Sequence, residues 1–204
     1  MAAARVTTDQ NLAREPRDTL VFDGAAPAAL QLASVPADAV VLYGALLRAV
    51  QMAGALEYLL AQSVQYANER VQFGQPIGKF QAVQHQIAVL AEHAAAATMA
   101  AEVAFRATER GEARFEIAVA KARISEAVEV ATSVAHAVHG AIGFSYEHAL
   151  QFTTRRLWAW RAEFGSETVW QRWLGQTVLA RGAENLWPDL TRAPQDHVLG
   201  REEP

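Results

Sequence analysis

The stretch that decides the fold reads RVQFGQPIGKFQ, residues 70–81, and it separates two long apolar helical patterns. A simple connection between bundle helices needs only a few residues, with glycine and proline setting the turn and polar side chains facing water. This stretch also carries Arg70, two aromatic residues and three glutamines. It therefore predicts a helix–helix corner whose composition is richer than a plain turn requires.

Apolar residues recur at helical spacing on both sides of the corner, and glycines or serines stand at the expected ends. Gly111 and Gly140 would close the second and third helices, while Ser145 and Ser166 could cap the fourth and fifth. We expect helices over about 37–69, 80–110, 115–139, 146–162 and 167–180. Because the connections are short, the sequence predicts an all-α fold, an antiparallel bundle of four long helices plus a shorter one.

The segments outside the bundle differ in composition. Residues 1–36 are rich in Ala, Pro and Asp and contain one short β-like run, 19–22, so we expect an irregular N-terminal linker or the remnant of a preceding β-domain. Residues 37–184 form the predicted bundle, and the polar tail 185–204 is expected to be loosely ordered.

Composition limits the class of protein. The 204 residues, 51% of them hydrophobic, suffice for one good core, and the absence of cysteine excludes disulfides and thiolate chemistry and fits a reducing cytoplasm. A net charge of −4 without a basic stripe argues against nucleic acid. Arg48 and Glu57 interrupt the longest apolar run, and no signal peptide is evident, so we expect a soluble, cytoplasmic protein with no membrane span.

The residues of the corner suit an anionic, partly aromatic ligand. A guanidinium such as that of Arg70 binds phosphate, Phe73 and Phe80 could flank a flat ring, and glutamine amides can bond its edges. The alternative is a structural role, in which the same residues cap and staple two helices. His136 and His139 could share a helix face, but no carboxylate stands beside them, and we expect no metal site.

Three segments carry a family resemblance. The string Tyr66 to Ile77, followed by Phe80 and Gln81, closely resembles the signature of acyl-CoA dehydrogenases at the start of their C-terminal helical domain. The segment 139–144 looks like that family's second glycine loop, and 155–166 sits where the family has an Arg-containing helix leading to a Glu-Gly-Thr turn. A complete member would also need an N-terminal helical domain and a middle β-domain, for which this chain has no room.

The resemblance implies a site for FAD. It assigns Arg70 to the FAD pyrophosphate, typically across a subunit interface, although a surface ion pair with Glu69 is the alternative. By the same resemblance, the further cofactor-binding candidates are Gln72, Phe73, Gln81, Gly140 and Ser166. The sequence departs from the family at Ala137 and Ala141, where a glutamine and a second glycine are usual, so contacts to the adenine half are expected to be reduced.

The catalytic base is missing from both family positions. Most relatives carry a glutamate immediately before the glycine matched by Gly165, and here that residue is Phe164; the other known position aligns with Gly44. Glu163 is the nearest catalytic candidate, because burial can raise the basicity of a carboxylate that takes a proton next to a thioester. Glu163 could equally be a dipole partner for the helix that follows.

The resemblance therefore implies a C-terminal domain or subunit of an FAD-dependent acyl-CoA dehydrogenase. Such an assembly desaturates an acyl-CoA thioester, passes electrons to an electron-transferring flavoprotein, and forms a homo- or hetero-oligomer, a dimer or tetramer. One alternative is a non-catalytic partner subunit of a heteromeric enzyme, lacking the base. The second alternative is an oligomerising helical domain without a cofactor.

Overall fold

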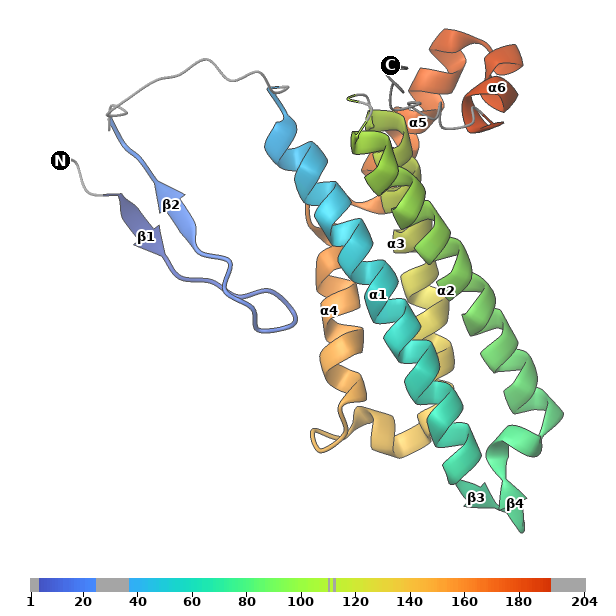
Figure 1. Ribbon diagram of the computed structural model, residues 1–204. Coiled ribbons are helices and arrows are strands. Elements are labelled where there is room, and N and C mark those ends of the chain that lie inside the picture. The colour runs from blue at the N-terminus through green and yellow to red at the C-terminus, as the bar shows by residue number, and fades with distance from the viewer. Residues whose placement is uncertain (1–3, 25–36, 110, 112, 192–204) are drawn as a thin grey trace, which may run out of the picture.

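The computed structural model describes residues 4–24, 37–109, 111 and 113–191. Its main elements are α1 (Ala39–Glu69), α2 (Gln81–Thr108), α3 (Arg114–His139), α4 (Leu150–Ala162), α5 (Glu167–Arg181) and α6 (Leu186–Thr191). As Figure 1 shows, α1, α2 and α3 run side by side along the long axis of the molecule. The all-α fold class is confirmed, with three long helices of 31, 28 and 26 residues and shorter ones after them.

Two small antiparallel strand pairs accompany the helices. Strand β1 (Arg5–Thr7) pairs with β2 (Thr19–Val21), and β3 (Val71–Gln72) pairs with β4 (Gln75–Pro76). The β-like run at 19–22 is thus confirmed, whereas its partner β1 was not predicted. A hairpin, β1–β2, therefore precedes the bundle within the described residues.

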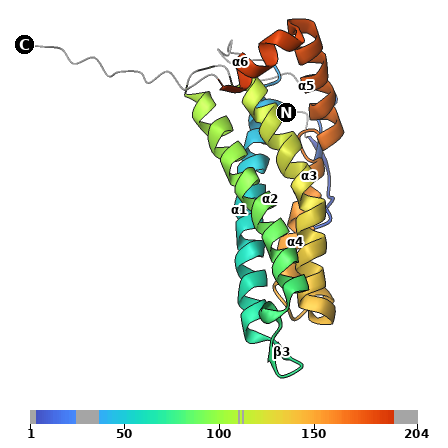
Figure 2. The ribbon, with the colours of Figure 1, turned by 90° about the vertical axis from the view of Figure 1, so that its right-hand side faces the viewer.

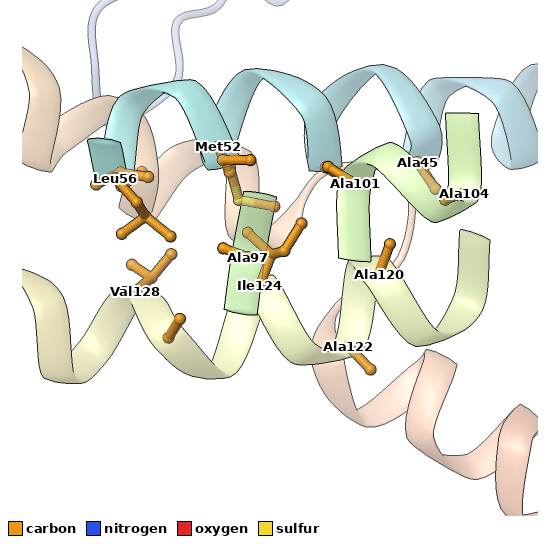
Figure 3. Close-up of a cluster of buried hydrophobic side chains, with 14 of the residues drawn as sticks. Ala45, Met52, Leu56, Ala97, Ala101, Ala104, Ala120, Ala122, Ile124 and Val128 are labelled. Atoms are coloured by element: carbon orange, nitrogen blue, oxygen red, sulfur yellow. The ribbon is translucent and has the colours of Figure 1, made fainter. Parts of the chain in front are cut away.

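The core lies where the apolar faces of α1, α2 and α3 meet. Met52 and Leu56 of α1, Ala97 of α2, and Ile124 and Val128 of α3 are all fully buried (Figure 3). Alanine recurs at three- and four-residue spacing along the buried side of α2, at positions 94, 97, 101, 104 and 107. Small side chains let neighbouring helices approach closely, and the larger residues of α1 and α3 fill the remaining space.

Three details differ from the sequence prediction. Helix α4 begins at Leu150 rather than near 146, and Ser145 ends a 3₁₀ turn, Gly140–Phe144, instead of capping α4. The tail expected to be loosely ordered contains α6, while residues 192–204 lie outside the described residues.

Helices α1 and α2 are long and apolar enough to cross a membrane by length and composition, but both bury one face within the bundle, as core helices of soluble proteins do.

Truncating a core side chain should lower stability strongly. Leu56→Ala removes a fully buried side chain between α1 and α3, and we expect the free energy of unfolding to fall by about 2–5 kcal/mol. Leu47→Ala on the same helix is the matched control, because Leu47 is 64% exposed and its loss should change stability by less than about 1 kcal/mol. Urea denaturation of both variants measures the difference; equal losses would contradict the core described above.

Candidate functional site

The corner between α1 and α2 is a tight hairpin with an aromatic residue at its tip. Gln72 pairs with Gln75, and the two residues between them, Phe73 and Gly74, have φ of 52° and 82°. Two consecutive positive φ values are typical of a two-residue hairpin turn, in which glycine is common and phenylalanine is not. Phe73 is nevertheless 92% exposed, although its ring lies edge-on to that of Phe80 with centroids 6.1 Å apart.

Arg70 stands at the C-terminal end of α1, where the chain enters this hairpin. Its backbone is held, because its N–H donates to the Tyr66 carbonyl at 2.9 Å and its carbonyl accepts from Ile77 at 2.8 Å. Its side chain is exposed, and over residues 4–24, 37–109, 111 and 113–191 no acceptor lies within hydrogen-bonding distance of the guanidinium. The corner therefore presents the guanidinium of Arg70 on a fixed backbone, and this guanidinium has no partner in the described chain.

Two more of the predicted cofactor residues lie at the same end of the bundle. Gln81 is the first residue of α2 and is exposed. Gly140 closes α3 with φ of 62° and ψ of −144°, a conformation essentially restricted to glycine, and a Cβ there would meet nothing within 4 Å. Figure 2 shows the β3 corner at the end of the bundle where α3 terminates.

Stacked rings join the ends of α1 and α3. Tyr66 stacks on His139 with ring centroids 4.5 Å apart, and the His139 Nδ1 lies 2.8 Å from the Ala135 carbonyl. His136 stacks on Phe144 at 4.3 Å. Burial lowers the pKa of both histidines, which favours neutral, packed imidazoles.

Glu163, the predicted base, lies in a dense ionic network instead of an open pocket. One carboxylate oxygen accepts from Arg17 at 2.7 Å and from Asn11 at 3.0 Å, and the other accepts from Arg48 at 2.7 Å. Arg48 also lies over the ring of Trp160, 5.2 Å from its centroid. Both oxygens of Glu163 are thus bound by cations from the N-terminal hairpin and from α1.

The loop of the β1–β2 hairpin is fixed to α4 by the same network. Glu15 accepts from the indole of Trp160 at 2.9 Å and from Arg156 at 3.2 Å, and Arg155 donates to the Leu12 carbonyl. Burial would raise the pKa of Glu15, but hydrogen bonds from Asn11, Trp160 and Arg156 outweigh it and lower the pKa to about 2. The hairpin loop is therefore bound to the bundle through the ionised carboxylate of Glu15.

The two family positions for a base meet in space. Phe164 has φ of 54° at the turn between α4 and α5, and a Cβ added to Gly44 would lie only 2.4 Å from the Phe164 ring. Gly44 is buried on α1, 120 residues away in sequence. The aromatic ring therefore fills the space that a side chain at position 44 would need.

Ser166 is far from the corner. It stands at the N-cap position of α5, but its hydroxyl makes no capping hydrogen bond. Arg48, which binds the neighbouring Glu163, precedes Arg70 by 22 residues of α1, which corresponds to about 33 Å at 1.5 Å per residue. The predicted site residues thus form two groups at separate places on the bundle: Arg70, Gln72, Phe73, Gln81 and Gly140 in one, and Glu163 and Ser166 in the other.

Lys121 was not predicted from the sequence, although a lysine on the apolar face of a helical pattern can indicate a buried, hydrogen-bonded charge. It is fully buried on α3, and its Nζ donates to the carbonyls of Arg161 at 2.8 Å and Gly165 at 2.9 Å. Burial lowers its pKa to about 8, an effect only partly offset by the charge of Glu163. Both acceptors flank Glu163 and Phe164.

A double-mutant cycle tests whether the hairpin is docked in solution. Arg17→Ala and Glu163→Gln should each lower the free energy of unfolding, and their coupling should be on the order of 1 kcal/mol because the pair is partly exposed. Pairing Arg17→Ala with Glu102→Gln on α2, whose partner is Arg106, should give no coupling. Additive effects of the first pair would contradict the docking.

The lowered pKa of Lys121 predicts a pH dependence of stability. Between about pH 8 and 10.5 the unfolded chain binds more protons at this lysine, so its contribution to the free energy of unfolding rises with pH. The full change is on the order of 3 kcal/mol, and it should vanish in Lys121→Met. Denaturant unfolding of both proteins across this range measures the difference, and parallel pH curves would refute it.

Comparison with known proteins places the chain. It matches the family description "Acyl-CoA dehydrogenase, C-terminal domain" over residues 37–179. It is 37% identical over 112 residues to acyl-CoA dehydrogenase IpdE2 of Mycolicibacterium smegmatis, which covers 55% of this chain and 35% of the relative. The chain therefore spans about a third of the length of that relative.

Solved structures share the fold. Butyryl-CoA dehydrogenase from Megasphaera elsdenii superposes with a TM-score of 0.79 at 24% identity, covering 87% of this chain and 49% of that one. The ChsE4–ChsE5 complex from Mycobacterium tuberculosis gives a TM-score of 0.75 at 25% identity, covering 89% and 50%. From the matched family domain over 37–179 and the shared helical bundle, the chain belongs to the acyl-CoA dehydrogenase family, as its C-terminal helical domain.

Proposed function

We propose that this chain is the C-terminal helical part of an FAD-dependent acyl-CoA dehydrogenase assembly, in which its corner binds FAD held mainly by another domain or subunit. The observation that carries the proposal is the exposed Arg70 guanidinium, which has no acceptor among the described residues while its backbone is fixed on both sides. A cation that extends from a fixed backbone without an internal partner suits an external phosphate.

The other residues at this end fit the same cofactor. Phe73 offers an exposed ring at the tip of the hairpin, and Gln72 and Gln81 expose amides that can bond polar edges. The open space around Gly140 allows another molecule to approach the backbone closely. When bound, FAD would supply the hydride acceptor for α,β-desaturation of an acyl-CoA thioester, and this chain's residues would bind and orient it.

Glu163 is the proposed proton acceptor, because it is the nearest carboxylate to the expected position. Arg17 and Arg48 bind its two oxygens. Proton abstraction from this chain would require the carboxylate to leave one of those ion pairs. In a turnover-competent assembly, loss of activity in Glu163→Gln would support this role, and retained activity would exclude it.

A second function has its own observation in favour. The Phe164 ring fills the space at Gly44, so both family positions for a base are occupied by groups that cannot accept a proton. This supports a non-catalytic subunit that completes a cofactor site on a partner carrying the base. The similarity to the ChsE4–ChsE5 complex, a pairing of unlike chains, is consistent with such a hetero-oligomer.

The remaining parts of the proposal follow from family membership. We infer a soluble, cytoplasmic dimer or tetramer, acting on an acyl-CoA and passing electrons to an electron-transferring flavoprotein. The exposed apolar residues on the outer faces of α1 and α2, among them Val50 and Met99, support contact with other subunits.

Removing the guanidinium should weaken FAD retention. We expect Arg70→Ala to raise the dissociation constant for FAD about 10- to 100-fold in the assembly that binds it, because a charge-assisted hydrogen bond contributes about 1.5–3 kcal/mol. Flavin absorbance per protomer after dialysis measures retention, and the thermal midpoint of the flavin-free protein should not change. Arg106→Ala, an exposed pair with Glu102 on α2, is the matched control. Unchanged flavin occupancy in Arg70→Ala would refute the cofactor role.

Co-expression separates the alternatives. The full chain should be purified alone and together with acyl-CoA dehydrogenase subunits encoded by adjoining genes, and its flavin spectrum recorded in each case. We expect yellow protein only in the complex, since the chain presents exposed cofactor contacts at one end and most of the FAD site is proposed to lie on another domain or subunit. Yellow protein from the chain alone would favour a self-sufficient site, and colourless protein in all cases would favour the cofactor-free helical domain.

A further inference from the structure

We propose that Lys121 is the positioning residue of the α4–α5 turn, where it holds the backbone so that the side chain of residue 164 is directed onto Gly44. Its importance for an enzyme rests on the proposed function. Its effect on the turn does not.

The turn needs external support because its conformation is unusual. Phe164 and Gly165 have φ of 54° and 97°, and a left-handed conformation is uncommon for a bulky residue such as phenylalanine. The last carbonyls of α4 also lack partners within the helix. A donor from outside the turn must therefore satisfy these carbonyls and select this backbone.

Lys121 provides that donor from a neighbouring helix. Its Nζ bonds the Arg161 carbonyl in the last turn of α4 and the Gly165 carbonyl beyond the left-handed residues. One ammonium group therefore joins the backbone on both sides of Glu163 and Phe164. Its positive charge also lies at the C-terminal end of α4, where the helix dipole favours a cation.

A second buried donor completes the arrangement. The indole Nε1 of Trp170 donates to the Phe164 carbonyl at 3.1 Å, and a Cβ at Gly165 would lie 2.6 Å from that same nitrogen. The turn is thus fixed by Lys121 from α3 and by Trp170 from α5. Neither contact involves the side chain of residue 164.

The turn conformation determines which part of the bundle the side chain of residue 164 can contact. The backbone aims this side chain at Gly44, and the present phenylalanine fills that space. Because the aim is set by the turn, whichever residue stands at position 164 should point to the same place. Lys121 therefore determines where the side chain of residue 164 meets α1.

Nuclear magnetic resonance can test the positioning directly, because the chain has only two lysines, Lys79 and Lys121. In Lys121→Met we expect the backbone amide signals of residues 164–166 and the indole signal of Trp170 to shift, while signals of the corner, 71–75, stay in place. Lys79→Met, an exposed residue outside the bundle core, should leave the turn signals unchanged. Unshifted turn signals in Lys121→Met would overturn the proposal.

A measurement on the unmodified chain keeps the proposal testable if Lys121→Met does not fold. The Lys121 ammonium protons should exchange slowly with water and show nuclear Overhauser contacts to backbone protons of residues 161–165, because the Nζ bonds the Arg161 and Gly165 carbonyls. Fast exchange of these protons, or the absence of those contacts, would overturn it.

Enzyme kinetics separate this proposal from the function proposed above. In a flavin-loaded, active assembly, Lys121→Met should lower kcat/KM at least tenfold while FAD occupancy remains that of the unmodified assembly, because the lysine lies far from Arg70. Unchanged kcat/KM would remove its role in the site. If no assembly binds flavin, the proposed function fails, and the resonance shifts still decide whether Lys121 holds the turn.

Discussion

The burial of one face of α3 against α1 and α2 is the contact on which the other features depend. Ile124 and Val128 meet Met52, Leu56 and the alanines of α2 without exposed surface, so the three axes are fixed relative to one another. Once α1 is held along its length, Arg48 within it and Arg70 at its C-terminal end become fixed positions about 33 Å apart. The corner at Arg70 and the ionic network at Arg48 therefore have a defined separation.

The polar groups at these two places differ in whether they have hydrogen-bond partners within the chain. Around the α4–α5 turn, Lys121 and Trp170 bond backbone carbonyls, and Glu163 is bound by two arginines. Partners are needed there because an unpaired buried polar group is costly. At the corner, Phe73 is 92% exposed with its ring edge-on to that of Phe80, and the exposed Arg70 guanidinium has no acceptor among the described residues. The first region is closed within the chain, and the second is open to another molecule.

The contact between Phe164 and Gly44 explains how the chain packs without an acidic residue at either family position for the base. Taken separately, a phenylalanine and a glycine at the two positions for a base are two losses. In the structure the two changes are coupled, because the absence of a side chain at Gly44 leaves the space that the ring of Phe164 occupies. A cavity here would cost packing energy, and the ring fills it. The region is thus packed as core rather than kept as a pocket.

The sequence by itself determined the helices, the corner between the first two, and the family resemblance. Local periodicity and turn chemistry are encoded within short windows, so the helices expected over about 80–110 and 115–139 match α2 and α3 closely. What only the tertiary structure decided involves partners distant in the chain. No local pattern shows the pairing of β1 with β2, the ion pairs of Glu163 with Arg17 and Arg48, the contact of Phe164 with Gly44, or the bonds of Lys121 across 40 and 44 residues. These contacts depend on how the helices pack, and packing brings together residues whose spacing in sequence carries no signal.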